Sequence, residues 1–265
     1  MDKSAQYKYE AIGLNPRDTT MYKGIVARMN YLGQDRTDIQ NTIKELGKDL
    51  ANPTNHSISK SKRLMRYLKG VPRLVIKYRY QENLMGITTW SGSDFAGCEK
   101  SRKSTSGGVL MHGSHLIKSW SVNQSVIALS SGEAEYYALV KSAAIALGVQ
   151  SLCSDLGVIC NRPIELKSDA SAAIGICNRI GLGKVRHIEV NQLWLQEKVA
   201  QGKMTITKVG TLENLADALT KSLDPESMRR HSEGIGAELR CDRHNLIPKL
   251  EMKEDQSPGD EIEVE

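Results

Sequence analysis

The sequence has few aromatic residues and a single phenylalanine, Phe95. Aromatic side chains make up 5% of the 265 residues. Phe95 and its neighbours do not form the stacking platform on which proteins hold the bases of single-stranded nucleic acid. Hydrophobic residues still amount to 40% of the chain, which is enough for the buried core of one large or two modest domains.

Cysteines and long apolar runs are also scarce. The cysteines are odd in number and none stands in a Cys-x-x-Cys pair, so neither a disulfide framework nor a zinc knuckle is indicated. No window approaches the 18 or so consecutive apolar residues of a membrane span, and the first residues lack the apolar core of a signal peptide. We expect a soluble intracellular protein, cytoplasmic or nuclear, with no membrane partner. The five cysteines are Cys98, Cys153, Cys160, Cys177 and Cys241.

Acidic residues are missing from one long stretch. The chain as a whole has 36 Lys and Arg against 31 Asp and Glu, a formal net charge of +5. A block without acids favours contact with a phosphate backbone. The alternative is a solvated helix face followed by a charged edge strand, and the run alone does not decide between them. The basic residues between His56 and Tyr80 are Lys60, Lys62, Arg63, Arg66, Lys69, Arg73, Lys77 and Arg79.

The hydrophobic pattern changes from helical to alternating near Arg73. Three amphipathic helices are predicted before this point, starting near Met21, Thr37 and Ser59. Hairpins after it make antiparallel strands and helical crossovers make parallel ones, so we expect an α/β fold with a mixed sheet. The predicted strands cover residues 73–80, 87–93, 107–112, 115–121, 164–169 and 204–209, and the predicted helices 131–155, 170–177, 188–200 and 215–223.

This pattern divides the chain into four segments. They are a flexible lead-in (1–18), a small helical unit (19–72), an α/β domain (73–235) and a tail (236–265). Residues 251–265 hold seven acids against Lys253 alone, which is typical of a disordered acidic tail. The helical unit is too short to be an enzyme and has no acid cluster, so the chemistry is expected in the α/β domain.

Acidic residues of the α/β domain fall at predicted strand ends and helix starts. Ends of neighbouring parallel strands lie side by side, so Asp94 and Asp169 can be close although far apart in sequence. Clustered carboxylates raise one another's pKa unless a cation such as Mg²⁺ or Mn²⁺ binds them. The alternative is a set of helix caps and solvated acids. The acids in question are Asp94, Glu133, Glu135, Asp169 and Asp217.

Six motifs stand in order along this domain. They are Trp90-Ser-Gly-Ser-Asp-Phe-Ala-Gly97, Arg102-Lys-Ser-Thr-Ser-Gly107, Ala128-Leu-Ser-Ser-Gly-Glu-Ala-Glu-Tyr136, Ser168-Asp-Ala-Ser-Ala-Ala173, Arg186-His-Ile-Glu189 and Leu215-Ala-Asp-Ala-Leu-Thr-Lys221. Together they resemble the ribonuclease H domain of copia-type LTR retrotransposon Pol polyproteins. Residues 21–70, with Ala51-Asn-Pro-Thr54 and Arg66-Tyr-Leu-Lys-Gly70, resemble the helical C-terminal end of the preceding reverse transcriptase. That portion has no Tyr-x-Asp-Asp motif, so no polymerase activity is expected.

The resemblance implies a fold, an activity and partners. The fold would be a ribonuclease H-like mixed five-stranded sheet with helices on both faces, preceded by the helical unit. The activity would be that of an endonuclease that cuts the RNA strand of RNA/DNA hybrids with two Mg²⁺ or Mn²⁺ ions. The partners would be the hybrid and the upstream reverse transcriptase portion of the same polyprotein.

The resemblance also assigns the acids that would hold the metal ions and carry catalysis. Helical geometry leaves Glu133 and Glu135 open, because they flank the apolar stripe of their helix on opposite sides. The family match, in which the acid precedes an aromatic residue, selects Glu135. With it the resemblance assigns Asp94, Asp169 and Asp217.

Substrate contacts are implied at two further places. Ser130 and Ser131 occupy the turn that in the family meets the minor groove, where 2′-hydroxyl groups distinguish RNA from DNA. Arg102 and Lys103 belong to the second motif and would contact the substrate as well.

Gly92 departs from the family pattern. The first strand usually reads Ser-Asp-x-Asp, and its first acid bridges the metal ions. Asp94 shares a face with position 92, but two strand residues span ~6.6 Å, whereas Mg²⁺ holds ligands at ~2.1 Å. Asp94 would take over only if the strand bulged or ended early at Gly92. We therefore expect weak or absent cleavage, and the alternatives are a catalytically decayed hybrid-binding module or a structural remnant of the polyprotein.

A second departure concerns cellular ribonucleases H, which carry a histidine between the last strand and the last acid. Here no histidine stands between Met204 and Asp217. If that residue moves a proton to the leaving group, its general acid–base contribution of ~10²–10⁴-fold is missing.

Overall fold

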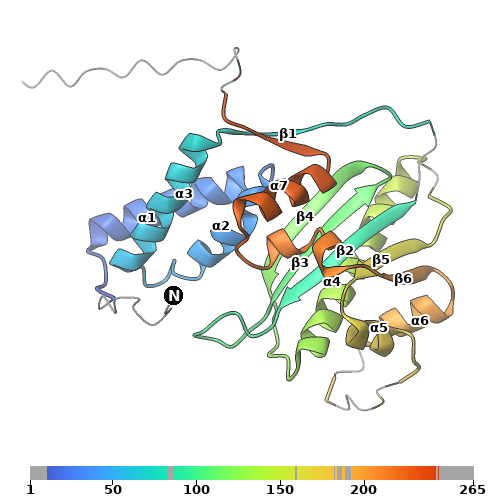
Figure 1. Ribbon diagram of the computed structural model, residues 1–265. Coiled ribbons are helices and arrows are strands. Elements are labelled where there is room, and N and C mark those ends of the chain that lie inside the picture. Colours follow the sequence, from blue (N-terminus) through green and yellow to red (C-terminus); the bar gives the residue numbers. More distant parts are fainter. Residues whose placement is uncertain are drawn as a thin grey trace, which may run out of the picture.

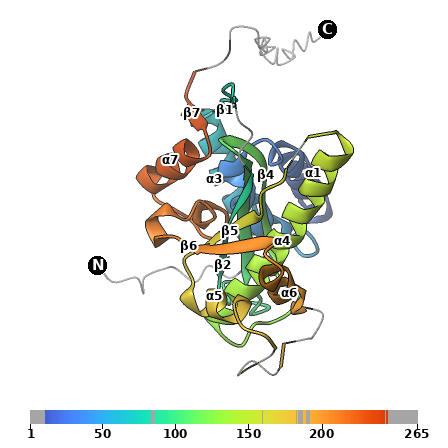
Figure 2. The ribbon, with the colours of Figure 1, turned by 90° about the vertical axis from the view of Figure 1, so that its right-hand side faces the viewer.

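The computed structural model describes residues 11–82, 86–158, 160–181, 183, 187–188, 192–242 and 244. Within them the chain forms a small helical unit beside a five-stranded sheet that has helices on both faces (Figures 1 and 2). This is the α/β arrangement that the sequence pattern predicts.

The helical unit consists of α1 (Pro16–Leu32), α2 (Gln40–Gly47) and α3 (Asn55–Gly70). Its core is built from six buried side chains of these helices and of the 3₁₀ turn Thr37–Ile39, namely Tyr22, Val26, Ile39, Ile43, Leu46 and Leu64.

The first helix begins earlier than the predicted end of the lead-in at residue 18. The Asn15 side chain accepts a hydrogen bond from the Asp18 N–H, and Pro16 occupies the first turn. Both are strong helix-start signals. The rest of the predicted lead-in, residues 1–10, lies outside the described residues.

The five-stranded sheet has the order β4-β3-β2-β5-β6. Its antiparallel part is β2 (Ile87–Asp94), β3 (Thr105–His112) and β4 (His115–Asn123), whereas β5 (Ile164–Ser168) and β6 (Met204–Lys208) run parallel to β2. The sheet is therefore mixed, as predicted, and its parallel strands β2 and β5 lie side by side at its centre.

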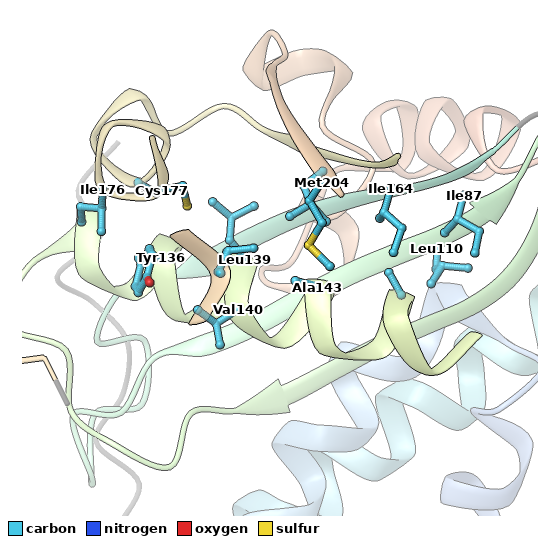
Figure 3. Close-up of a cluster of buried hydrophobic side chains, with 14 of the residues drawn as sticks. Ile87, Leu110, Tyr136, Leu139, Val140, Ala143, Ile164, Ile176, Cys177 and Met204 are labelled. Carbon is cyan, nitrogen blue, oxygen red and sulfur yellow. The ribbon is translucent and has the colours of Figure 1, made fainter. Parts of the chain in front are cut away.

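Helices cover both faces of the sheet. On one face lie α4 (Ser131–Asp155), α5 (Ser171–Cys177) and α6 (Trp194–Ala200), and their apolar side chains close the main core against Ile164 and Leu110 (Figure 3). On the other face lie a 3₁₀ turn, Asp217–Leu219, and α7 (Pro225–Gly234). Figure 2 shows α4 and α7 on opposite sides of the strands.

Among the described helices, α4 is the one long and apolar enough to be compared with a membrane span. Its 25 residues have a mean hydropathy of 1.2 over the most apolar window, enough by length and composition to cross a membrane. Leu139, Val140 and Ala143 of this helix are buried against the sheet. We therefore attribute the apolar character of α4 to core packing.

The first predicted strand of the α/β domain is wrong in its length and in its partner. The strand predicted at 73–80 is shorter, β1 (Arg73–Ile76), and it does not join the main sheet. It pairs antiparallel with β7 (Ala237–Arg240), which lies in the segment predicted as a disordered tail. The remaining tail residues, 243 and 245–265, lie outside the described residues. Alternation alone shows that a strand forms, but not which partner supplies its hydrogen bonds.

The helix predicted over residues 215–223 is also wrong. The chain makes only the short turn Asp217–Leu219 there, and the helix α7 follows at Pro225. The Asp224 carboxylate caps α7 by accepting the N–H groups of Glu226 and Ser227, and Pro225 occupies the first turn. This cap and proline start the helix after the apolar pattern that suggested it.

Buried polar contacts fasten the helical unit. The Arg36 guanidinium donates to Asp38 at 2.7 Å and to the Val71 carbonyl at 3.0 Å, and Tyr67 donates to the same Asp38 carboxylate at 2.7 Å. Lys44 reaches across to the sheet and donates to the Thr105 hydroxyl at 2.6 Å. The end of α3 and the start of β3 are thereby held to the helical unit.

The Arg36–Asp38 pair offers a stability test. Both side chains are almost fully buried, at 5% and 0% exposure, so Asp38→Ala leaves an uncompensated buried charge. We expect the free energy of unfolding to fall by about 3–5 kcal/mol, measured by urea denaturation. Lys48→Ala, which removes a partly exposed pair with Glu45, serves as the control and should cost less than about 1 kcal/mol. Equal effects of both changes would contradict the assignment.

Candidate active site

The predicted site acids lie where β2 and β5 end. These strands run parallel, with Trp90 opposite Lys167 as their last registered pair. Gly92 and Asp169 each follow two residues later, so the two positions meet at the same edge of the sheet. The N-terminal turns of α4 and the 3₁₀ turn at Asp217 reach this edge from the two opposite faces.

Glu135 is the acid that α4 brings to this edge. Its Oε1 accepts the Ser93 N–H at 3.0 Å, which ties α4 to β2. Its Oε2 is buried and has no hydrogen-bond partner among the residues that the structure describes. Burial raises the pKa of this carboxyl to about 7, and the negative charges of Asp169 and Asp217 act in the same direction. Glu135 is thus a carboxylate that lacks a counter-charge.

Asp169 and Asp217 complete a group that we call the acid cluster, Glu135, Asp169 and Asp217. Asp169 follows β5 and accepts from the Asn214 amide at 3.2 Å, and Asp217 pairs with Lys221 at 2.7 Å. Across the described part of the chain, no three His, Cys, Asp or Glu side chains are arranged as a ready-made metal site. The charges of Asp169 and Asp217 nevertheless act on Glu135, so the three acids share one end of the sheet although they are not arranged as a metal site.

Gly92 faces the acid cluster directly. A Cβ atom there would lie 3.8 Å from the Asp217 Oδ1, 3.3 Å from the Asn214 Nδ2 and 3.4 Å from the Ala216 Cβ. A side chain at position 92 would therefore extend towards Asp217, where a carboxylate could join the acid cluster as a metal ligand. The contacts are tight, and a side chain fits only if the Asn214 amide yields by a few tenths of an ångström.

Asp94 does not join the other three acids. Its carboxylate fills the space over Gly97, in the turn after β2. Its negative charge favours the charged form of Lys44, although burial lowers the pKa of that lysine overall. The strand pairing is regular from Gly92 through Asp94, opposite Gly107 through Thr105, so β2 neither bulges nor ends at Gly92. The bulge or early strand end that would let Asp94 replace a carboxylate at position 92 is therefore not present in β2.

Glu133 has a structural role, and this separates it from Glu135. It is 2% exposed, and its carboxylate accepts from Tyr137 at 2.9 Å and from the Leu129 N–H at 3.0 Å. It also lies 2.7 Å from the His187 Nε2. These contacts hold the turn before α4 in place, and they leave Glu133 no free oxygen to offer to the acid cluster.

The predicted substrate contacts lie in two loops at the same end of the sheet. Ser130 is the N-cap of α4, accepting the Glu133 N–H at 3.2 Å, and Ser131 is exposed beside it. Arg102 is exposed in the turn between β2 and β3, where it has a positive φ of 55°, and Lys103 follows. The two loops are joined because Gln124 donates its N–H to the Ser104 carbonyl at 2.8 Å.

Asn214 is a site residue that the sequence did not reveal. It is fully buried, and its amide donates to the Ser91 carbonyl at 3.1 Å and to Asp169 at 3.2 Å. Its Oδ1 accepts the Ala216 N–H at 3.1 Å. One side chain thus links β2, Asp169 and the turn that carries Asp217. No local pattern around a single asparagine signals such a role.

Comparison with known proteins gives relatives that cover most of this chain. The Retrovirus-related Pol polyprotein from transposon RE1 of Arabidopsis thaliana is 30% identical over 225 residues, which are 84% of this chain and 15% of that protein. The corresponding polyprotein from transposon RE2 of the same plant is 30% identical over 220 residues, 83% of this chain and 15% of that protein. The chain therefore spans about 15% of the length of these relatives.

Solved structures similar to the chain include ribonucleases H. LC11-RNase H1 in complex with RNA/DNA hybrid is 14% identical, with a TM-score of 0.34, over 50% of this chain and 92% of that one. The N-terminal RNase H domain of a Mycobacterium tuberculosis protein is 12% identical, with a TM-score of 0.34, over 56% of this chain and 97% of that one. No protein-family model matches the chain.

The Pol polyproteins match both the helical unit and the domain with the mixed sheet, since their alignments extend over more than four-fifths of the chain. The homologues of this chain are therefore retrovirus-related Pol polyproteins of copia-type transposons, of which it matches a segment, and its main sheet is mixed and five-stranded with helices on both faces.

Proposed function

We propose that the α/β domain is a ribonuclease H-type endonuclease that binds RNA/DNA hybrids and cuts their RNA strand slowly, by a two-metal mechanism. The observation that carries the proposal is the meeting of Glu135, Asp169 and Asp217 at the edge where β2 and β5 end. Two of these acids come from opposite faces of the sheet.

The donor set of the acid cluster suits a hard divalent cation. All three side chains offer carboxylate oxygens, which Mg²⁺ and Mn²⁺ prefer, and the Glu135 Oε2 is buried without a partner. When bound, such ions act as Lewis acids and lower the pKa of coordinated water. The residues of this chain would hold the ions, with Ser93 orienting Glu135 and Asn214 orienting Asp169.

The slow rate follows from Gly92. The acid cluster has three carboxylates, and the position facing it from β2 has no side chain. Asp94 points elsewhere, so nothing in the described residues takes over the missing ligand. Substrate binding is a separate matter, because Ser130, Ser131, Arg102 and Lys103 lie in loops that Gly92 does not shape.

A second candidate function is favoured by the same residue. The domain would then be a decayed module that binds the hybrid without cutting it, beside the reverse transcriptase portion of a polyprotein. The two candidates share the substrate and differ in the chemical step, so a cleavage assay separates them.

The cleavage test uses a labelled RNA/DNA hybrid with Mg²⁺. We expect slow cutting of the RNA strand by the unmodified chain, and Asp169→Asn should lower the rate by at least ~10²-fold, the scale on which loss of one electrostatic group acts. Arg229→Gln, a change on an exposed part of α7, is the control and should leave the rate unchanged. Hybrid binding without any cleavage would favour the decayed module.

Restoring the missing carboxylate should raise activity. Gly92→Asp places a fourth acid opposite Asp217, and we expect cleavage to increase by ~10²-fold or more. Gly92→Asn has nearly the same shape without the charge and should give no increase. An unchanged rate for Gly92→Asp, with Mg²⁺ binding also unchanged by calorimetry, would show that position 92 is not a ligand position.

The raised pKa of Glu135 predicts a pH dependence of stability without metal. The folded chain holds this proton up to about pH 7, whereas the ordinary value is 4.5. The stability that the proton confers is therefore complete below pH 4.5 and is lost as the pH rises through about 7, on the order of 3 kcal/mol in all. Urea unfolding in EDTA at pH 5 and pH 8 measures it. Glu135→Gln should remove most of the difference, and an equal loss in this variant would contradict the assignment.

A further inference from the structure

We propose that residues 251–265, which we call the acidic segment, dock on the exposed face of α3 in the same chain and cover its cations. The inference concerns the surface of the helical unit and does not depend on the function proposed for the acid cluster. The acids of this segment are Glu251, Glu254, Asp255, Asp260, Glu261, Glu263 and Glu265.

The exposed face of α3 is a row of cations. The buried side of the helix is formed by Ser57, Ser61 and Leu64. At 100° per residue, four exposed basic residues fall on the opposite half of the helix circumference, and the helix contains no acid. The surface that we call the α3 basic face consists of Lys62, Arg63, Arg66 and Lys69.

The α3 basic face lacks a counter-charge in the part of the chain that the structure describes. None of its four cations forms an ion pair with another described residue, whereas Lys100 pairs with Asp49 at 3.2 Å. Arg66 follows Lys62 by four positions and Arg63 by three, and like charges at these spacings destabilise a helix. Acidic side chains supplied from elsewhere would relieve this repulsion.

The path of the chain brings its last described residues to the end of α3. Strand β1 begins three residues after Gly70, and β7 pairs with it antiparallel, with Arg240 opposite Arg73. Strand β7 therefore runs back towards α3, as Figure 1 shows. Asp242 pairs with Arg73 at 3.0 Å. The chain thus passes residue 242 beside the C-terminal end of α3.

The acidic segment follows within reach of this point. Residues 243–250, which contain no acid, can span up to about 30 Å at ~3.5 Å per residue. The 16 residues of α3 are about 24 Å long. The whole α3 basic face therefore lies within the range of the acids that begin at Glu251.

Charge and connectivity favour this occupant. The acidic segment holds seven acids against Lys253 alone, opposite in sign to the face. Because both belong to one chain, their contact is intramolecular and is favoured by an effective concentration on the order of mM. Exposed ion pairs are individually weak and are screened by salt. The contact is therefore a salt-sensitive cover that competes with other polyanions for the face.

The first experiment joins carboxylates to lysines that lie in contact. The full chain is treated at low ionic strength with a water-soluble carbodiimide, and linked peptides are identified by mass spectrometry. We expect links from Lys62 and Lys69 to the acidic segment, and their loss at about 1 M salt, where charges are screened beyond about 3 Å. Lys203, exposed before β6, is the control and should form no such link. Mixing ¹⁵N-labelled with unlabelled chain separates links within one chain from links between two.

The second experiment measures how accessible the lysines of the face are. Removing acids from the segment should raise the acetylation rates of Lys62 and Lys69 by about twofold or more, because reactivity follows the fraction of molecules in which the face is free. The rate at Lys203 should stay unchanged. The test variant is Glu254→Gln/Asp255→Asn/Glu261→Gln. The matched control removes the same types of charge at exposed positions elsewhere, as Asp155→Asn/Glu197→Gln/Glu213→Gln, and should leave all rates unchanged.

The inference requires both results. Links within one chain, together with faster acetylation in the test variant alone, support it. Links only between two chains show that a second copy supplies the acids and overturn it. Links to Lys203 as frequent as those to Lys62, or equal acetylation rates in both variants, also overturn it. None of these outcomes depends on cleavage or hybrid binding, so the proposed function stands or falls separately.

Discussion

The close approach of residues 214–220 to the sheet is the constraint on which the site depends. This segment lies on two glycines that pair across β2 and β3, Gly92 and Gly107. A Cβ atom at Gly107 would stand 2.7 Å from the Thr220 Cγ2 and 2.9 Å from the Leu219 Cβ, distances that do not occur between packed atoms. Because residue 107 is glycine, residues 214–220 can pack directly on the sheet. This packing places Asp217 beside the other two residues of the acid cluster.

The two paired glycines have different meanings. Gly107 is required by packing, because backbone and Cβ atoms occupy the space of its missing side chain. At Gly92 the nearest atom is the end of the Asn214 amide, at 3.3 Å, and a side chain there needs only a small adjustment. Packing therefore excludes a side chain at position 107, whereas it leaves room for one at position 92 after a small shift of the Asn214 amide.

Charge organises the rest of the molecule in two ways. At the candidate active site, partly buried carboxylates are held by a small number of directed hydrogen bonds, from Ser93 to Glu135 and from Asn214 to Asp169. On the helical unit the exposed cations of α3 form no ion pair with any other residue that the structure describes. The first arrangement presents carboxylate oxygens, which suit a compact divalent cation.

Sequence patterns predicted the elements better than their partners. Alternation and periodicity identified the strands of the main sheet and the long helix α4, and the ordered motifs identified the family, because both are properties of local stretches of chain. The pairing of β1 with β7 and the late start of α7 escaped them. The alternating pattern of a strand does not specify which strand it pairs with. The Asp224 cap and Pro225 start α7 after the apolar residues that suggested an earlier helix.

The sequence by itself determined which acids exist, that position 92 is glycine, and that the chain resembles a Pol polyprotein segment. Only the tertiary structure decided which acids meet. In the folded chain the Asp94 carboxylate lies over Gly97. Glu133 holds the turn before α4, and Asn214 links β2 to Asp169. These decisions depend on contacts between residues as much as 123 positions apart, Asn214 with Ser91. Such contacts follow from how the helices and the 3₁₀ turn pack on the two faces of the sheet, which no local stretch of sequence encodes.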